Sequence, residues 1–249
     1  MTTEFFSEQF DSAYPDGVEY HWWLLARSRI VASAVAAFAG PRSAVLEIGC
    51  GRGIVVTSLR DAGIDCSGVE LAQVEPIDAA KEHVRVGIDA AALPDAERRR
   101  YDTILLLDVI EHLPEPSPFL QEFAGAFPNL SRVIVTVPAR QELWSNYDEF
   151  YGHYRRYTPE LLDALASELG WTLGRTSYFF HLVYLPAWLM IKLKRSRATR
   201  ITPPRGVGRL VHRLLSRAMV VDYYVFPRRL VGTSVLGCFT VEKDAARIR

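Results

Sequence analysis

The stretch VLEIGCGRG, residues 45–53, is an apolar run that carries one acid, Glu47, and ends in glycines at alternate positions. A buried strand followed directly by a glycine turn is typical of sheets that bind nucleotide-like ligands, because glycine lets the backbone approach the ligand closely. Gly49, Gly51 and Gly53 are therefore the first candidate binding residues.

The spacing of these glycines narrows the choice of ligand. A phosphate-binding loop would have Lys and then Ser or Thr after its last glycine, and the sequence GRGIVV has neither. A dinucleotide fingerprint, G-x-G-x-x-G, would place its third glycine where Ile54 stands. The observed G-x-G-x-G spacing, with the carboxylate of Glu47 nearby, favours a cationic ligand without phosphate, such as one that carries an ammonium or sulfonium group.

On both sides of this stretch, short β-rich apolar runs alternate with helical patterns, which predicts a parallel sheet covered by helices on both faces. The predicted strands are residues 44–48, 66–69, 84–86, 103–107 and 133–137. The predicted helices are residues 21–38, 54–62, 73–82 and 118–127.

The pattern changes after the fifth predicted strand. Residues 139–158 are polar and aromatic without a period, which predicts a long loop, and 158–170 read as a capped helix. Residues 171–180 and 235–243 are predicted strands six and seven. Between them, residues 180–232 form a basic, helix-prone insertion.

Length and composition fit one α/β domain over residues 1–249, with no net charge overall. The three cysteines are scattered without CxxC spacing, which indicates a reducing compartment and no metal site. The first ten residues lack the basic and apolar regions of a signal peptide, so the expected location is the cytoplasm. The apolar stretch 178–193 is interrupted by His181, Pro186 and Lys192 and is too short to span a bilayer comfortably.

Glu70, at the end of the second predicted strand, adds a second binding feature. An acid at this position typically accepts hydrogen bonds from the two ribose hydroxyls of an adenine nucleoside. By itself Glu70 could equally be an ordinary acid near a helix. Together with the spacing of the glycines, it favours a nucleoside site.

Five segments occur in the order and spacing of a known family. VLEIGCGRG, GVE (68–70), GIDAAALP (87–94), YDTILLLDVIEHLPEP (101–116) and VIVTVPA (133–139) resemble the successive motifs of class I S-adenosylmethionine (SAM)-dependent methyltransferases. The resemblance is closest to the ubiquinone-biosynthesis-like branch, in the type 11/12/23 group, and covers residues 21–180 and the last strand. It implies a Rossmann-like, doubly wound, seven-stranded α/β sheet in the order 3-2-1-4-5-7-6, with the last strand antiparallel.

The same resemblance implies SAM as cofactor and assigns its contacts. Gly49, Gly51 and Gly53 would line the methionine and ribose portions, Glu47 would lie near the methionine amino group, and Glu70 with the adjacent Leu71 would bind the ribose. Asp89 would contact the adenine amino group beside the backbone of Ala90, and Asp108 would face the methionyl end. Alternatively, Asp89 is a turn residue and Asp108 is the N-cap of a helix.

The methyl acceptor is expected beyond the carboxyl ends of the strands. His153 and His112 are the candidate general bases, although a loop histidine is often a structural hydrogen-bonding residue. The candidate acceptor contacts are Trp144, Tyr147, Arg155, Arg156 and Tyr157. The two arginines could clamp a carboxylate or phosphate. Alternatively, one lies at the surface and the other packs against Asp148.

The expected reaction is methyl transfer to an oxygen or nitrogen, less readily a carbon, of a small molecule, a sugar or a lipid-linked saccharide. A SAM-fold protein without catalysis is the alternative from another class, but the intact glycine turn and acids argue against it. A nucleic-acid methyltransferase that uses the basic residues of 192–229 is a second alternative. LLDVIE stands where an N-P-P-Y-type tetrad would follow the fourth strand, so nucleic acid is not an expected partner.

The insertion suggests a further partner. Residues 192–229 carry eleven Lys or Arg side chains against one acid, Asp222. In 208–226, Leu210, Val211, Leu214, Leu215 and Met219 share one helical face, with arginines off it. Such a cationic amphipathic pattern is compatible with peripheral contact through 178–229 at the inner membrane face. Packing of this face on the domain or on a homodimer partner is the alternative.

Overall fold

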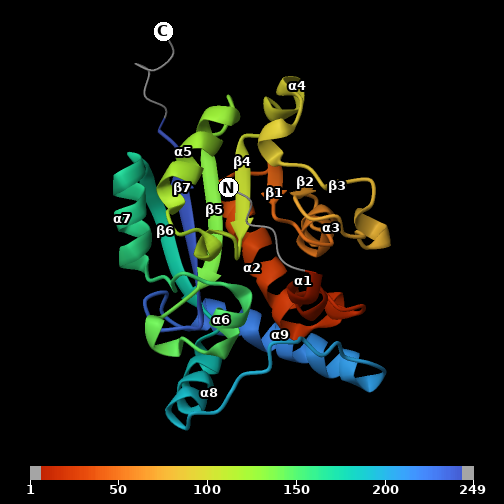
Figure 1. Cartoon of the computed structure of the whole chain (residues 1–249), viewed down its shortest axis with the longest axis vertical. Helices are drawn as coiled ribbons and strands as arrows, with labels where there is room; N and C mark the ends of the chain where they lie inside the picture. The colour runs from red at the N-terminus through yellow and green to blue at the C-terminus, as the bar shows by residue number, and fades with distance from the viewer. Residues whose placement is uncertain (1–6, 243–249) are drawn as a thin grey trace.

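The computed structural model describes residues 7–242 and contains one seven-stranded sheet in the order β3-β2-β1-β4-β5-β7-β6 (Figure 1). The strands are β1 (Ala44–Ile48), β2 (Asp65–Glu70), β3 (Val84–Val86), β4 (Thr103–Leu107), β5 (Arg132–Pro138), β6 (Thr172–Phe179) and β7 (Ser234–Thr240). β7 lies between β5 and β6 and is antiparallel to both, whereas the pairs among β1 to β5 are parallel. The predicted fold and strand order are confirmed. Lys243 of the predicted last strand, and the two ends of the predicted domain, lie outside the described residues.

Helices cover both faces of the sheet. α2 (Trp22–Phe38), α3 (Ile54–Asp61) and α9 (Val207–Val225) pack on one face, and α5 (Pro116–Ala126) and α7 (Pro159–Leu169) pack on the other. The remaining helices are α1 (Ser7–Ala13), α4 (Asp95–Arg98), α6 (Asn146–Tyr151) and α8 (His181–Lys192), with 3-10 turns at Val18–Tyr20, Asp78–Ala80, Ala90–Ala92, Ile110–His112 and Gln141–Leu143. The central strand β4 is buried along its whole length, which explains its unbroken apolar sequence TILLL.

The predicted helix 73–82 is wrong. Only the 3-10 turn Asp78–Ala80 forms there. Pro76 disfavours helical geometry at Glu75 and has no amide proton for a helical hydrogen bond. Instead, the segment pairs with the glycine turn: the amide of Ile77 donates to the carbonyl of Arg52 (3.0 Å), and the Arg52 side chain donates to the carbonyl of Glu75 (3.0 Å).

The predicted long loop 139–158 contains the 3-10 turn Gln141–Leu143 and the helix α6. A capping box begins α6: the Ser145 side chain accepts from backbone amides of the first turn, and the Asp148 side chain accepts from the backbone amide of Ser145. The S-x-x-D spacing is visible in the sequence. The helix is only six residues long, too short to show a helical period.

The insertion forms α8 and α9, which lie beyond the carboxyl ends of the parallel strands, at the bottom of Figure 1. Asp222 of α9 is buried and accepts hydrogen bonds from the amides of His181 (2.9 Å) and Leu182 (3.0 Å) at the start of α8. This carboxylate therefore joins the two helices. No helix among residues 7–242 is long and apolar enough to cross a membrane.

The packing of α9 differs from the predicted amphipathic face. Met219 is buried against the domain together with Ser216 and Tyr223. The other members of the predicted face, Leu210, Val211, Leu214 and Leu215, are exposed. These four side chains therefore do not pack on the domain, because the buried side of α9 is formed by Ser216, Met219, Asp222 and Tyr223.

Candidate active site

A cavity of about 960 Å³ lies where β1, β2, β4 and β5 end. Gly49, Glu70, Asp108 and Pro138 line it from these strand ends, and the inner side of α8 lines it opposite them. The volume is at the upper end of the range for small-molecule sites. The cavity is therefore large enough for a nucleoside-sized cofactor and a second molecule.

The glycine turn between β1 and α3 has positive φ at Gly49 (70°), Gly51 (55°) and Gly53 (78°), a conformation that favours glycine. Gly49 lines the cavity, whereas Gly51 and Gly53 do not. A Cβ atom at Gly51 would lie 2.8 Å from the ring of Tyr14, and one at Gly53 would lie 2.6 Å from the Cβ of Ala80. Because Gly51 and Gly53 have no side chains, Tyr14 and Ala80 can pack closely on the turn.

Glu70 and Leu71 both line the cavity at the end of β2. The carboxylate of Glu70 accepts hydrogen bonds from the amides of Gly51 (2.8 Å) and Ala72 (3.0 Å). These two bonds fix the orientation of Glu70 beside the glycine turn, and each leaves its oxygen with capacity for another donor.

Glu47, in β1, is buried and does not line the cavity. Its Oε2 has no hydrogen-bond partner among the described residues. Burial raises the pKa of Glu47 to about 8, although the nearby Arg27 opposes this shift.

Asp89 and Ala90 line the cavity beyond β3. The side chain of Asp89 accepts from the amide of Ala91 (2.9 Å) and so caps the 3-10 turn Ala90–Ala92. Asp89 therefore caps a turn, as the alternative interpretation had it, and also lines the cavity.

Asp108 follows β4, lines the cavity and has a positive φ of 59°. Its carboxylate is ion-paired with the buried guanidinium of Arg27 from α2, which also lies 4.4 Å from the ring centroid of Trp23. Arg27 was not among the residues predicted for the site. A signal for it exists, because an arginine within the apolar face of a helix must find a buried partner.

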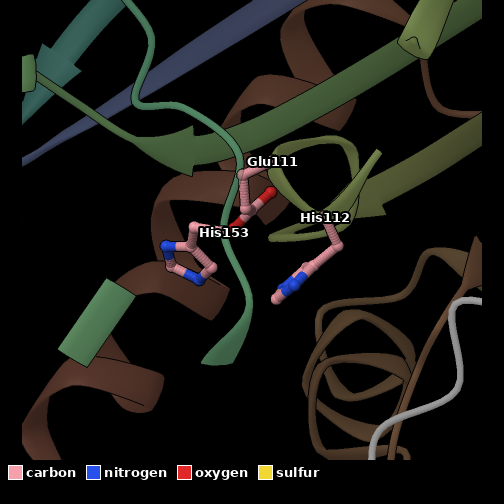
Figure 2. Close-up of side chains that lie close together, drawn as sticks. All are labelled: Glu111, His112 and His153. Carbon is pink, nitrogen blue, oxygen red and sulfur yellow. The ribbon is translucent and has the colours of Figure 1, made fainter. Parts of the chain in front are cut away.

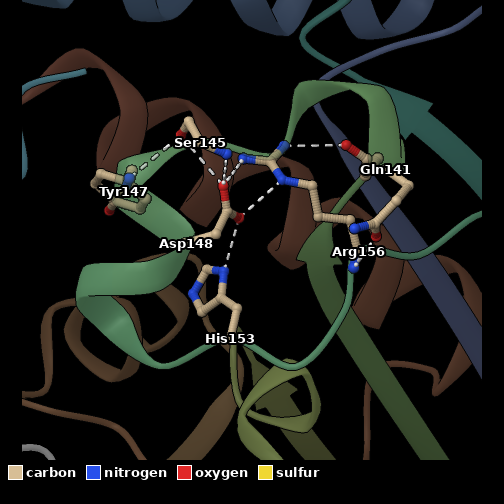
Figure 3. A network of polar contacts seen from close by, with 7 residues as sticks. Gln141, Ser145, Tyr147, Asp148, His153 and Arg156 are labelled. Carbon is tan, nitrogen blue, oxygen red and sulfur yellow. Dashed lines mark hydrogen bonds and ion pairs between the residues drawn. The ribbon is translucent and has the colours of Figure 1, made fainter. Parts of the chain in front are cut away.

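Asp148 organises the acceptor side of the cavity (Figure 3). Its fully buried carboxylate accepts from Nδ1 of His153 (2.9 Å), from Nε and Nη2 of Arg156 (2.8 and 3.0 Å) and from the amide of Ser145 (2.9 Å). Burial alone would raise the pKa of Asp148, but the hydrogen bonds from His153 and Arg156 outweigh burial and lower it. Asp148 is thus an anion that fixes the positions of His153 and Arg156.

Of the five residues predicted to contact the acceptor, two line the cavity and three do not. Tyr147 and Arg156 line the cavity, and the ring of Tyr147 packs under the guanidinium of Arg197 (3.9 Å). Trp144, Arg155 and Tyr157 do not line it. Arg155 donates to the carbonyl of Pro114, and the Tyr157 hydroxyl donates to the carbonyl of Ile110 (3.1 Å). Only one of the two adjacent arginines therefore packs against Asp148.

Glu111, His112 and His153 meet at this end of the cavity (Figure 2). The two imidazole rings lie edge to face with centroids 4.8 Å apart. Burial and the neighbouring His153 lower the pKa of His112 to about 3, so this ring is neutral near pH 7. Glu111 is fully buried, and burial followed by repulsion from Asp108 raises its pKa. Sequence analysis pointed to both histidines but missed Glu111.

The mixed sheet in this order, with a cavity at its carboxyl edge and acids after β2, β3 and β4, is a Rossmann-like architecture of the class I SAM-dependent methyltransferase type. The family described as methyltransferase domain matches residues 23–175, more than half of the chain. The chain therefore belongs to the methyltransferase domain family, and SAM is the cofactor expected of such a domain.

Curated relatives match shorter segments. The ubiquinone biosynthesis O-methyltransferase of Shewanella pealeana is 33% identical over 88 residues, which cover 32% of this chain and 37% of the relative. The enzyme of the same name from Methylococcus capsulatus is 33% identical over 80 residues, which cover 29% of this chain and 33% of the relative. The chain thus spans about a third of the length of these relatives.

Solved structures share the fold at low identity. A chain of the complex between the Haloferax volcanii Trm112 methyltransferase activator and the putative methyltransferase has a TM-score of 0.55 at 17% identity, with 95% of this chain and 97% of that chain covered. Magnesium protoporphyrin IX methyltransferase from Synechocystis, with bound S-adenosylhomocysteine (SAH), has a TM-score of 0.52 at 14% identity, with 88% and 83% covered.

Proposed function

We propose that this protein is a SAM-dependent methyltransferase that acts on an oxygen or nitrogen of a small-molecule or lipid-linked acceptor. One observation carries the proposal: a single cavity joins the acids at the ends of β2 to β4 with the cluster of Glu111, His112 and His153. A proposed cofactor half and a proposed acceptor half thus share one cavity, as a bimolecular transfer requires.

The residues of the cofactor half fit SAM by their chemistry. Glu70 and Asp89 offer acceptor oxygens at the end proposed for the ribose and adenine. Asp108, paired with Arg27, places a carboxylate at the end proposed for the methionyl ammonium and the sulfonium. When bound, SAM supplies an electrophilic methyl group. The protein's contribution is to align the acceptor in line with that methyl group and to exclude water.

His153 is the residue that we propose prepares the acceptor for attack. Its Nδ1 is held by Asp148 at 2.9 Å, which leaves Nε2 as the nitrogen available to the cavity. A carboxylate that orients an imidazole in this way also fixes its tautomer. Nε2 can then act on the acceptor directly as a base or through a bound ion, with His112 beside it as the second imidazole.

The wall formed by α8 indicates the kind of acceptor. The inner side of this helix, including Val183, Pro186 and Met190, lines the cavity with apolar groups. Its outer side exposes Leu182, Leu185, Leu189 and Leu193, which we call the α8 leucine face. Together with the basic residues of 192–229, this face supports peripheral contact with an anionic membrane surface and a lipid-linked acceptor. A homodimer is the competing explanation of the exposed leucines.

The proposed function is tested by two measurements on the full chain. Calorimetry with SAH reports the cofactor half, and an acceptor screen that detects SAH production reports transfer. We expect SAH binding in the native protein and turnover with a hydroxyl or amine acceptor. We expect His153→Ala to lower turnover by roughly a hundredfold while SAH binding is retained. Bound SAM without turnover on any acceptor class would instead indicate a non-catalytic binding protein.

A further inference from the structure

Glu111 is a buried carboxylate without a hydrogen-bond partner for its side chain among residues 7–242. None of its surface is exposed, and neither Oε1 nor Oε2 forms a hydrogen bond with another described residue. A buried carboxylate in this situation is costly unless a cation or a donor joins it. Since Glu111 lines the cavity, that partner can reach it from the cavity side.

Two imidazoles face the same point. Glu111, His112 and His153 each offer one ligand atom, and these atoms lie within 4.8 Å of one another (Figure 2). Around a tetrahedral ion, ligand atoms at about 2.1 Å from the metal are roughly 3.4 Å apart. Binding of an ion therefore requires side-chain rotations that bring the three atoms closer together.

The surroundings of each histidine match those of a metal ligand. His153 binds Asp148 through Nδ1, which leaves Nε2 for an ion. His112 forms a hydrogen bond with the backbone of Tyr151. An imidazole that binds a carboxylate or carbonyl through one nitrogen and the ion through the other is the usual arrangement at metal sites.

Backbone contacts hold the two contributing segments together before any ion binds. The amide of Tyr154, next to His153, donates to the carbonyl of Glu111 (2.8 Å). The hydroxyl of Tyr157 donates to the carbonyl of Ile110 (3.1 Å). The loop that carries His153 is thereby fixed against the turn that carries Glu111 and His112.

We propose that Glu111, His112 and His153 bind one divalent transition-metal ion, such as Zn²⁺, at the acceptor end of the cavity. Two imidazoles and one carboxylate suit such an ion better than Mg²⁺ or Ca²⁺, which prefer ligand sets made of oxygen. No cysteine takes part, which is why cysteine spacing gave no sign of the site. With three protein ligands, the ion keeps an open position toward the cavity.

This proposal rests on the proposed methyl transfer for its purpose, although metal binding itself does not. An acceptor hydroxyl beside the ion would lose its proton to water more readily, because the positive charge favours the deprotonated oxygen. That oxygen then forms a bond to the methyl carbon as the carbon–sulfur bond breaks and its electron pair stays on sulfur. The products are the methylated acceptor, SAH and one proton. His153 acts on the acceptor through the ion in this scheme.

The test uses tag-free, full-length protein treated with a chelator and then titrated with Zn²⁺ by calorimetry. We expect saturable binding of one ion per chain, weakened at least tenfold by Glu111→Gln and by His153→Ala. The matched control is His83→Gln, a histidine that does not line the cavity, and it should bind like the native protein. Titration with Co²⁺ should give a visible spectrum without a thiolate band, since the buried thiols Cys50, Cys66 and Cys238 are not ligands.

Native protein that takes up no ion, or variants that bind as the native protein does, would overturn the proposal. SAH calorimetry on each variant reports whether the variant folds. If Glu111→Gln does not fold, the double variant His112→Gln with His153→Gln tests Zn²⁺ binding in its place. A chain that transfers methyl groups equally well without metal refutes the role of the ion in transfer and leaves the proposed function intact. A chain that binds Zn²⁺ but transfers no methyl group supports the metal site and refutes the proposed function.

Discussion

The backbone amide of Gly51 donates a hydrogen bond to Oε2 of Glu70 at 2.8 Å. This bond joins the glycine turn after β1 to the end of β2, the two segments that flank the proposed nucleoside position. The carboxylate of Glu70 is therefore already oriented toward the cavity that it lines, and a ligand need not pay the entropy of ordering it.

Removal of this carboxylate should weaken the cofactor site. We expect Glu70→Ala to reduce SAH affinity by about 1–3 kcal/mol, because a charged hydrogen-bond partner is lost from a partly buried site. Calorimetry with SAH measures the change. Glu75→Ala, an exposed acid in the next segment, is the control and should bind SAH like the native protein. Equal affinity in Glu70→Ala would remove Glu70 from the cofactor site.

Asp148 should contribute to stability as well as to the site. Asp148→Ala would leave the guanidinium of Arg156 buried without its counter-ion, since Arg156 is 4% exposed and Asp148 is fully buried. Breaking a buried pair in this way typically costs about 3–5 kcal/mol. Urea unfolding measures the loss. Ser145→Ala, which removes the helix cap and the hydroxyl bond to Asp148 (3.2 Å) but keeps the ion pair, should cost about 1 kcal/mol. If both variants lose the same unfolding free energy, the ion pair between Asp148 and Arg156 contributes no stability beyond that of the helix cap.

The fold was predictable because it rests on local patterns. The alternation of apolar runs with helical patterns predicted the strands and a doubly wound sheet. The strand order 3-2-1-4-5-7-6 came from the resemblance of the motifs to a known family. The prediction failed where a pattern was misleading or too short. Residues 73–82 have helix-forming composition, but Pro76 and the pairing with Arg52 prevent a helix. In 139–158 the capping box of Ser145 and Asp148 starts a helix too short to show a period.

The candidate site was predictable only in part. Glu70, Asp89 and Asp108 follow strands in recognisable motifs, and all three line the cavity. Arg27 was detectable only as an arginine within an apolar helix face, and Glu111 lies in the motif 101–116 but was given no role of its own. Arg27 meets Asp108 across 81 positions of sequence, and the unpaired state of Glu111 depends on what surrounds it in three dimensions.

His21 should make stability depend on pH. It begins α2, where its Nδ1 accepts from the amide of Trp23 (3.4 Å), so the ring must be neutral at that nitrogen. Burial and the neighbouring His212 lower the pKa of His21 to about 4, against about 6.5 in an unfolded chain. Between these values the unfolded chain binds more protons than the folded one. The stabilisation is therefore complete above pH 6.5 and falls as the pH drops toward 4.

Replacement by serine tests this dependence, because His21→Ser keeps a helix cap but cannot titrate. The loss of unfolding free energy between pH 7 and pH 5 should be smaller in the variant by roughly 1 kcal/mol, a value reduced to allow for the partial exposure of the ring. Urea unfolding at the two pH values gives the comparison. If the variant loses as much stability as the native protein, His21 does not titrate in the way proposed.

The α8 leucine face should bind anionic membranes. Leu182, Leu185, Leu189 and Leu193 are each at least 45% exposed, and the eleven basic side chains of 192–229 follow directly in the sequence. Apolar burial and attraction to anionic headgroups act together on such a surface. We expect the protein to co-sediment with vesicles that contain phosphatidylglycerol at low salt, and to be released from them as salt is raised. Vesicles of phosphatidylcholine alone should bind it much less.

Variants separate a membrane surface from a dimer interface. Leu185→Gln with Leu189→Gln should reduce the sedimented fraction severalfold, because two apolar contacts with the lipid are lost. Leu161→Gln, which changes a similarly exposed leucine on α7, should sediment like the native protein. Protein that stays in the supernatant at low salt would exclude the membrane contact. If such protein also sediments as a dimer that the double variant dissociates, the exposed leucines form an interface between two copies of this chain, and the acceptor then has no need of a lipid anchor.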